Sequence, residues 1–223
     1  MSEKRRKHPV VQLYTYVGTP QLVFFIALIL VLILPVFTVN NYSLISTFFN
    51  SFFLGSLYYL VKSHNPKRLR LIGFFVLLAF IDSWSSYFGY KLDNEIDFII
   101  PLILLILSFY YVFKSILKSD EVDIDTVISA ISGYILIGLG FGILFYIIEI
   151  IRPGNFFGME QLNYYEAEYF SFVTMSTLGY GDIAPSSQIA RSLVILTTLF
   201  GQFYMVIVMG IIVGKFISNR KKN

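Results

Sequence analysis

The segment Thr177–Asp182, with the sequence TLGYGD, is the part of the chain best suited to chemistry. Gly179 and Gly181 stand at alternate positions, and glycine adopts backbone angles that residues with a Cβ resist. Successive peptide carbonyls can then turn toward one axis, while the side chain of Tyr180 points away from it. The hydroxyl of Thr177 adds one more oxygen at the end of the row. A ring of such oxygens can replace the hydration shell of a potassium ion.

This hexapeptide resembles the selectivity filter of the potassium channel family, and other residues fit the same pattern. The aromatic pair Tyr169–Phe170 stands where the pore helix of the family usually opens, and Pro185 follows the hexapeptide as it often does in the family. Gly201 lies in the last apolar run, where many members carry a hinge glycine. The resemblance covers about residues 130–216, and the N-terminal half is less diagnostic.

The resemblance implies a pore helix at residues 165–176 that leads into the filter. Because the chain holds a single hexapeptide, four copies would surround one axis as a homotetramer. Potassium would be the permeant ion, with no other cofactor or metal and no nucleic acid partner. The expected ion-binding residues are Thr177, Leu178, Gly179, Tyr180 and Gly181, of which the first four offer carbonyls, with Asp182 at the outer mouth.

The composition indicates a membrane protein, since 56% of the residues are hydrophobic and only 14% are charged. A helix needs about 20 mainly apolar residues to span a bilayer. We therefore expect an all-α membrane protein with six transmembrane helices plus a re-entrant pore helix and selectivity filter per subunit. The apolar runs that approach or exceed the required length lie at about 21–39, 43–61, 70–90, 97–113, 126–150 and 190–215.

These runs divide the chain into four expected parts. They are a cytoplasmic segment at 1–20, a four-helix domain at 21–118, a pore domain at 126–216 that ends with an inner helix at 190–215, and a short tail at 217–223. The layout resembles that of voltage-gated channels, whose sensor needs several Arg or Lys residues at three-residue intervals within a span. Residues 99–113 in the fourth span carry none. Strong voltage dependence is therefore not expected.

Basic clusters set the expected orientation. They lie at residues 4–7, 62–70 and 215–222, which six spans would place on one side of the membrane. The positive-inside rule makes that side the cytoplasm, so both termini are expected there. The loop that carries Glu166 and Glu168 is then external. We expect a multi-pass protein of a prokaryotic plasma membrane, in contact with lipids.

The outer mouth departs from a common family pattern. Val173 occupies the pore-helix position where some bacterial members carry a Glu that binds the Asp after the filter, so this mouth must be held differently. Asp182 is either a surface negative charge or an acceptor that ties the filter to an aromatic residue such as Tyr169, and we favour the tie. Leu178 stands where Val or Ile is commoner, but only its carbonyl would face the ion.

The last span carries side chains that recur on one helical face. By the resemblance this face lines the cavity and the inner gate. The amide of Gln202 would meet either cavity water or a neighbouring helix, and Gly201 is either a hinge or a close-packing position; both questions stay open. The glycines of the preceding span favour close helix packing. The cavity face comprises Thr198, Gln202, Met205 and Met209, and the packing glycines are Gly138, Gly140 and Gly142.

Asp82 is an acid within the third expected span, and such residues are functional candidates. Its serine-rich surroundings favour a structural polar patch, with proton or ligand sensing as the alternative. His8 and His64 both lie beside basic flanks, and no nucleophile–base or zinc-binding spacing occurs, so an enzyme is not expected.

The sequence favours a potassium-selective channel that passes ions passively. Two alternatives remain within the same family: a non-conducting subunit that modulates a related channel, and a weakly selective cation channel. A transporter subunit would usually carry several degenerate pore loops in one chain, whereas this chain has one complete loop.

Overall fold

Helices dominate the computed structural model, which describes residues 19–37, 50–51, 53–58, 60–61, 73–74, 76–81, 84, 99–119, 122–158 and 162–220. Parts of the expected spans at 43–61 and 70–90, together with Asp82, lie outside these residues. The elements follow one another as α2 (Pro20–Phe37), α5 (Ile99–Lys118), α6 (Ile124–Ile151), β1 (Phe156–Phe157), α7 (Tyr164–Met175), β2 (Ala184–Pro185) and α8 (Gln188–Arg220).

Three helices in the described part of the chain are long and apolar enough to cross a membrane. The apolar stretches are Pro101–Lys118, Ile124–Ile151 and Gln188–Ser218, and a shorter one covers Pro20–Ile33. The described part of the chain is therefore mostly helical, and three of its helices could span a membrane. A total of six spans stays a prediction.

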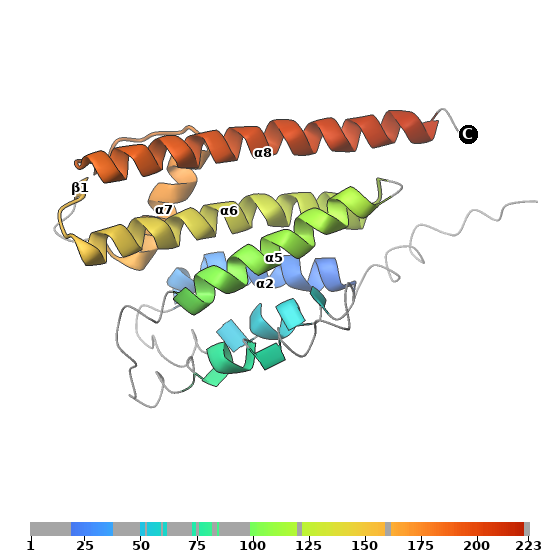
Figure 1. Cartoon of the computed structure of the whole chain (residues 1–223), viewed down its shortest axis with the longest axis horizontal. Coiled ribbons are helices and arrows are strands. Elements are labelled where there is room, and N and C mark those ends of the chain that lie inside the picture. Colours follow the sequence, from blue (N-terminus) through green and yellow to red (C-terminus); the bar gives the residue numbers. More distant parts are fainter. Residues whose placement is uncertain are drawn as a thin grey trace, which may run out of the picture.

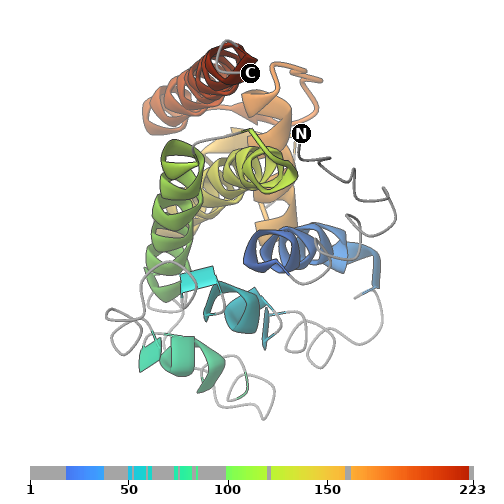
Figure 2. The same ribbon diagram turned by 90° about the vertical axis from the view of Figure 1, so that its right-hand side faces the viewer.

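Helix α6 is the central element. It packs against α2, α5, α7 and α8. Figure 1 shows α8 running beside α6, with α2 on the opposite side and α7 lying between α6 and α8 at one end. Figure 2 shows the same layers end-on. The main core cluster joins α2, α5 and α6 through residues such as Leu28, Leu104 and Leu136.

The start of α6 is fixed by polar groups. Asp123 is its N-cap, and its carboxylate accepts hydrogen bonds from the backbone N–H of Thr126 at 2.8 Å and from the Thr126 hydroxyl at 2.7 Å. Asp125 in the first turn accepts a hydrogen bond from the hydroxyl of Thr19 at 2.9 Å. Carboxylates are favoured at a helix N-terminus, where unpaired N–H groups gather. These contacts tie the beginnings of α2 and α6 together.

The middle of α8 is locked onto α6 by a tyrosine. The hydroxyl of Tyr204, which is buried, donates a hydrogen bond to the carbonyl of Ala130 at 2.7 Å. Gly133 makes room for that ring, because a Cβ there would lie 2.1 Å from the Tyr204 hydroxyl. Ile116 of α5 and Val208 of α8 pack in the same cluster. The part of α8 around Tyr204 and Val208 is thus fixed to both α6 and α5.

A lysine near the end of α8 caps α5. The ammonium of Lys215 donates hydrogen bonds to the carbonyls of Ile116 at 2.7 Å, Leu117 at 3.0 Å and Ser119 at 2.5 Å. The last carbonyls of a helix lack partners within the helix, and a cation there is favoured by the helix dipole. The cap therefore joins the end of α5 to the C-terminal part of α8.

We expect Lys215→Met to lower the free energy of unfolding by about 1–3 kcal/mol, because hydrogen bonds from a charged donor contribute on this scale. Thermal unfolding of the purified protein in detergent measures the change. Lys118→Met is the matched control, since it removes a cation from the last turn of α5 that makes no such bridge to α8 in the described structure. Equal losses in the two variants would show that the bridge does not stabilise the fold.

Candidate functional site

The helix that leads to the hexapeptide starts with a capping box. The side chain of Asn163 accepts a hydrogen bond from the backbone N–H of Glu166 at 3.0 Å, and the Glu166 carboxylate accepts one from the backbone N–H of Asn163 at 2.8 Å. This reciprocal pair satisfies two of the free N–H groups at the start of the helix. Helix α7 spans Tyr164–Met175, against the 165–176 expected from the sequence.

The end of α7 is closed by the first residues of the hexapeptide. The backbone N–H of Thr177 donates to the carbonyl of Thr174 at 3.0 Å, and that of Leu178 donates to the carbonyl of Val173 at 3.0 Å. This pair of bonds is a Schellman cap, which requires a left-handed residue after the helix, usually glycine. Here that residue is Thr177, with φ 61°. A β-branched residue in this conformation is strained by about 1–2 kcal/mol.

Left-handed backbone recurs at alternate residues of the hexapeptide. Thr177 has φ 61°, Gly179 has φ 56° and Gly181 has φ 80°. Between them Leu178 and Tyr180 keep negative φ. Such an alternation allows successive peptide carbonyls to face the same side of the chain. The two glycines are apparent from the sequence, whereas the left-handed Thr177 is missed, although its place just beyond a helix end could have indicated it.

The hexapeptide is not packed within one chain. The side chain of Leu178 is 60% exposed and that of Tyr180 is 68% exposed. A Cβ added to Gly179 or Gly181 would meet nothing within 4 Å. The segment therefore keeps its conformation through the cap of α7 at one end and the contacts of Asp182 at the other.

Asp182 is tied to α7 as favoured from the sequence. The hydroxyl of Tyr169 donates a hydrogen bond to the Asp182 carboxylate at 2.7 Å. This bond holds the pKa of Asp182 below its ordinary value, because it stabilises the charged form. The same bond raises the pKa of Tyr169.

A two-stranded sheet also holds the residues after the hexapeptide. Strand β1 pairs antiparallel with β2, so that Phe156 faces Pro185 and Phe157 faces Ala184. Gly158 directly follows β1 and has φ 100°. It lies so close to Asp182 that an added Cβ would be 1.9 Å from the Asp182 carbonyl oxygen. The segment before α7 thus braces the mouth in the absence of a carboxylate at Val173.

The turn between α6 and β1 is organised by a buried carboxylate. Glu149, 4% exposed, accepts hydrogen bonds from the backbone N–H groups of Gly154 at 2.8 Å and Asn155 at 2.9 Å. The side-chain amide of Asn155 donates to the carbonyls of Ile148 and Arg152. Beyond the hexapeptide, the hydroxyl of Ser186 donates to the carbonyl of Gly154 at 2.6 Å. The turn after α6 is therefore tied to the residue that follows β2.

Two glycines of α6 form the seat of α7. A Cβ on Gly138 would lie 2.4 Å from the ring of Phe172, and one on Gly142 would lie 3.0 Å from the Cα of Glu168. The hydroxyl of Ser171 donates to the carbonyl of Gly138 at 2.7 Å, which the sequence did not indicate. Gly140 has nothing within 4 Å of an added Cβ. The packing expected for the three glycines is thus seen at Gly138 and Gly142.

Comparison with known proteins shows what this part of the chain is similar to. Residues 126–218 match a family model described as ion channel. The chain is 28% identical over 146 residues to potassium channel K2 of Plasmodium berghei, 31% over 149 residues to potassium channel K2 of Plasmodium falciparum, and 34% over 84 residues to two-pore potassium channel 4 of Arabidopsis thaliana. Residues 126–218, called the channel domain below because of this match, are thus similar to the ion channel domain of potassium channels.

The coverage of these matches is partial. The matches to the two K2 channels take in 59% and 61% of this chain but 10% of each relative, and the match to the two-pore channel takes in 38% of this chain and 28% of the relative. The chain thus spans about a tenth of the length of the K2 channels it matches. No solved structure matches. The match to an ion channel model and the three long apolar helices of the described residues together indicate an integral membrane protein.

In the channel domain, two residues of α8 contact the end of α7. Gly201 is buried, and an added Cβ would lie 2.3 Å from Cγ of Met175 and 3.0 Å from its carbonyl oxygen. The side-chain amide of Gln202 donates to the same carbonyl at the long distance of 3.5 Å. Close packing, one of the two roles left open for Gly201, is therefore present, and Gln202 reaches a neighbouring helix. Met205 and Met209 are about half exposed in the single chain.

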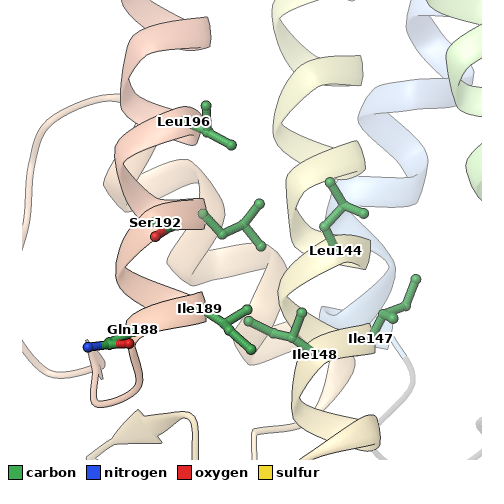
Figure 3. Close-up of a pocket in the computed structure, with 8 residues that line it drawn as sticks. Leu144, Ile147, Ile148, Gln188, Ile189, Ser192 and Leu196 are labelled. Atoms are coloured by element: carbon green, nitrogen blue, oxygen red, sulfur yellow. The ribbon is translucent and has the colours of Figure 1, made fainter.

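A cleft of about 530 Å³ lies between α6 and α8 in the channel domain. Figure 3 shows Ile148 of α6 facing Ile189 of α8 across it, and Leu144, Ile147 and Leu196 also line the cleft. Its lining is mainly apolar and includes no residue of the hexapeptide. The cleft therefore plays no direct part in binding an ion there.

We expect Gly158→Ala to disrupt the outer mouth far more than Gly154→Ala. Both glycines have left-handed φ, so both variants carry a similar backbone strain of about 1–2 kcal/mol. Only at Gly158 does the new Cβ meet another backbone, that of Asp182. Thermal unfolding of the two purified variants, compared with the unchanged protein, measures the difference. Equal destabilisation would mean that the contact of Gly158 with Asp182 does not brace the mouth.

We expect Tyr169→Phe to raise the pKa of Asp182 toward its ordinary value, because the variant lacks the hydroxyl that stabilises the carboxylate. An acid with a lowered pKa stabilises the folded state above its unfolded pKa, and that contribution is lost as the pH falls through the folded pKa. The variant should therefore lose stability at a higher pH during acidification. Carboxyl NMR titration and acid unfolding measure both effects.

The control for this prediction is a double-mutant cycle with Asp182→Asn. In the background of Asp182→Asn, the change Tyr169→Phe should no longer shift the acid-unfolding midpoint. A shift of the same size with and without Asp182 would contradict the tie.

Proposed function

We propose that the chain is a subunit of a potassium-selective channel that passes K⁺ passively across the membrane. The carbonyls of Thr177, Leu178, Gly179 and Tyr180, with the Thr177 hydroxyl, are the proposed ligands, and Gly181 completes the row. The observation that carries this proposal is the alternation of left-handed φ at Thr177, Gly179 and Gly181. This alternation supports the proposal because it allows successive carbonyls to form a row of oxygens, of the kind that can replace the hydration shell of K⁺.

A homotetramer completes the site in this proposal. Each chain supplies one filter segment, and a closed ring of oxygens needs several. The support is the exposure of Leu178 and Tyr180, together with exposed apolar side chains along α8, for instance Phe203 at 59% and Val206 at 70%. Exposed apolar surface of this extent indicates contact with lipid or with further copies. Cyclic symmetry would bring four filters to one axis.

The helices around the proposed filter suit a cation pathway. The C-terminal end of α7 carries a partial negative charge and lies next to the inner end of the filter. The face of α8 with Gln202, Met205 and Met209 is the proposed wall of the cavity and gate, with Gly201 packed behind it against Met175. The mouth at Asp182 lies on the outer side of the plasma membrane in this proposal, and both termini lie on the cytoplasmic side.

Recordings from purified protein in a bilayer test the proposal. With different potassium and sodium concentrations on the two sides, the reversal potential should lie near the potassium value. A reversal potential far from it would indicate the weakly selective cation channel. Absence of current from correctly assembled tetramers would indicate the non-conducting modulatory subunit instead.

We expect Gly181→Ala to abolish or degrade the selective current while assembly persists. Gly154→Ala is the matched control, because both glycines have left-handed φ and open space around an added Cβ, and only Gly181 lies in the filter. Current and oligomeric state are measured for both variants. Selective current retained in Gly181→Ala would contradict the assignment of the filter.

A further inference from the structure

Helix α7 contains an acid that the conduction of K⁺ does not use. Glu168 is only 6% exposed, whereas Glu166, two residues earlier, takes part in the capping box at the surface. The sequence suggests that both carboxylates belong to an external acidic loop. The structure separates them, because the two residues lie on different faces of α7.

Glu168 sits at a close contact between α7 and α6. Tyr164 and Phe172 stand one helical turn before and after it, and both pack against the core cluster of α2, α5 and α6. The backbone of Glu168 lies against Gly142, where an added Cβ would be 3.0 Å from the Glu168 Cα. The acid thus stands in a row of aromatic side chains at an apolar junction.

The described residues provide no ion pair or hydrogen bond to the Glu168 carboxyl. On α7 its titratable neighbours are Tyr164 and Tyr165. On α6, Tyr146 packs edge-on against Tyr164 with ring centroids 6.0 Å apart, and Glu149 is occupied by the backbone of the following turn. Helix α2 has no ionisable side chain along its length. On α8, which also packs against α7, Arg191 donates to the carbonyl of Pro185 and Lys215 donates to the end of α5. No cation on these helices compensates a charge at Glu168.

Burial without a partner favours the neutral form of an acid. It raises the pKa of Glu168 from 4.5 to about 7, with desolvation as the cause. Helix α7 is not one of the membrane-crossing helices, and Glu168 lies in its first half, toward the outer mouth. Protons on that side can therefore change its charge near neutral pH.

We propose that Glu168 is a proton-binding site through which external pH controls conduction. With the carboxyl neutral, α7 packs closely on α6 and the core beneath it. When the carboxyl ionises, the charge draws water into this junction and loosens the seat of α7. Because the Schellman cap at Thr177 joins the end of α7 to the filter, a loosened helix disturbs the ion sites and lowers the current.

The sign of the effect follows from linkage. The native state keeps the proton of Glu168 at pH values where the unfolded chain has already lost it. Stability should therefore fall as the pH rises from about 4.5 to about 7, and level off above that window. A variant with a neutral side chain at this position has no such slope.

The first test does not depend on conduction. Infrared difference spectra should show the band of a protonated carboxyl that disappears as the pH rises through about 7 in the unchanged protein. The band should be absent in Glu168→Gln and kept in Glu166→Gln, which alters an exposed carboxylate of the same helix. A Glu168 carboxyl already ionised at about pH 5.5, one unit above the ordinary value, would overturn the proposal.

The second test measures potassium current while only the external pH is changed, and this readout rests on the proposed function. Between about one pH unit below and one above the midpoint, the protonated fraction falls roughly tenfold, and the current should fall with it. Glu168→Gln and Glu168→Leu should give high current at both pH values, and Glu166→Gln should keep the pH dependence. The same pH profile in Glu168→Gln as in the unchanged protein would overturn the proposal.

The two tests separate this proposal from the proposed function. If the protein carries no current but the carboxyl band titrates near neutral pH, proton binding at Glu168 stands and the channel function fails. If selective current is present but no band titrates, the channel function stands and the proton site fails.

Discussion

The conformation of the proposed filter, residues 177–182, depends on how α7 ends. Two backbone hydrogen bonds, from Thr177 to Thr174 and from Leu178 to Val173, turn the chain out of the helix and place Thr177 in the left-handed region. That turn starts the alternation of backbone angles that Gly179 and Gly181 continue. Glycine at the first position would relieve the strain but remove the hydroxyl. The strain at Thr177 therefore fits the pattern in which an unfavourable backbone conformation is retained at a functional site.

The cap can act only because α7 is held on both sides. On α6, the missing side chains of Gly138 and Gly142 let the two helices approach, and Ser171 donates to the backbone of Gly138. On α8, Gly201 packs against Met175. Small residues at helix crossings favour close approach inside a membrane, where apolar burial alone distinguishes little between protein and lipid. In our proposal, this close packing makes the contact between α7 and α6 depend on the charge of the buried Glu168 carboxyl.

Local sequence predicts much of the candidate site. It predicts less of the surrounding structure that holds the site in place. Alternate glycines give the backbone extra freedom wherever they occur, so the proposed filter can be located from TLGYGD alone. The tie of Asp182 to Tyr169 could be favoured from residue type. Local sequence could not predict the pairing of β1 with β2 or the approach of Gly158 to Asp182. Both contacts join segments that are separated by α7. Two-residue strands leave no alternating pattern to detect.

The sequence by itself indicated a membrane protein and the TLGYGD segment, because hydrophobic run length and glycine spacing are local properties of the chain. Tertiary structure decided the environment of side chains that look alike in the sequence. Glu166 caps a helix at the surface while Glu168 is buried, and Gly140 meets open space while Gly138 and Gly142 seat a helix. Burial and close approach depend on which elements meet, and a residue's type does not contain that information.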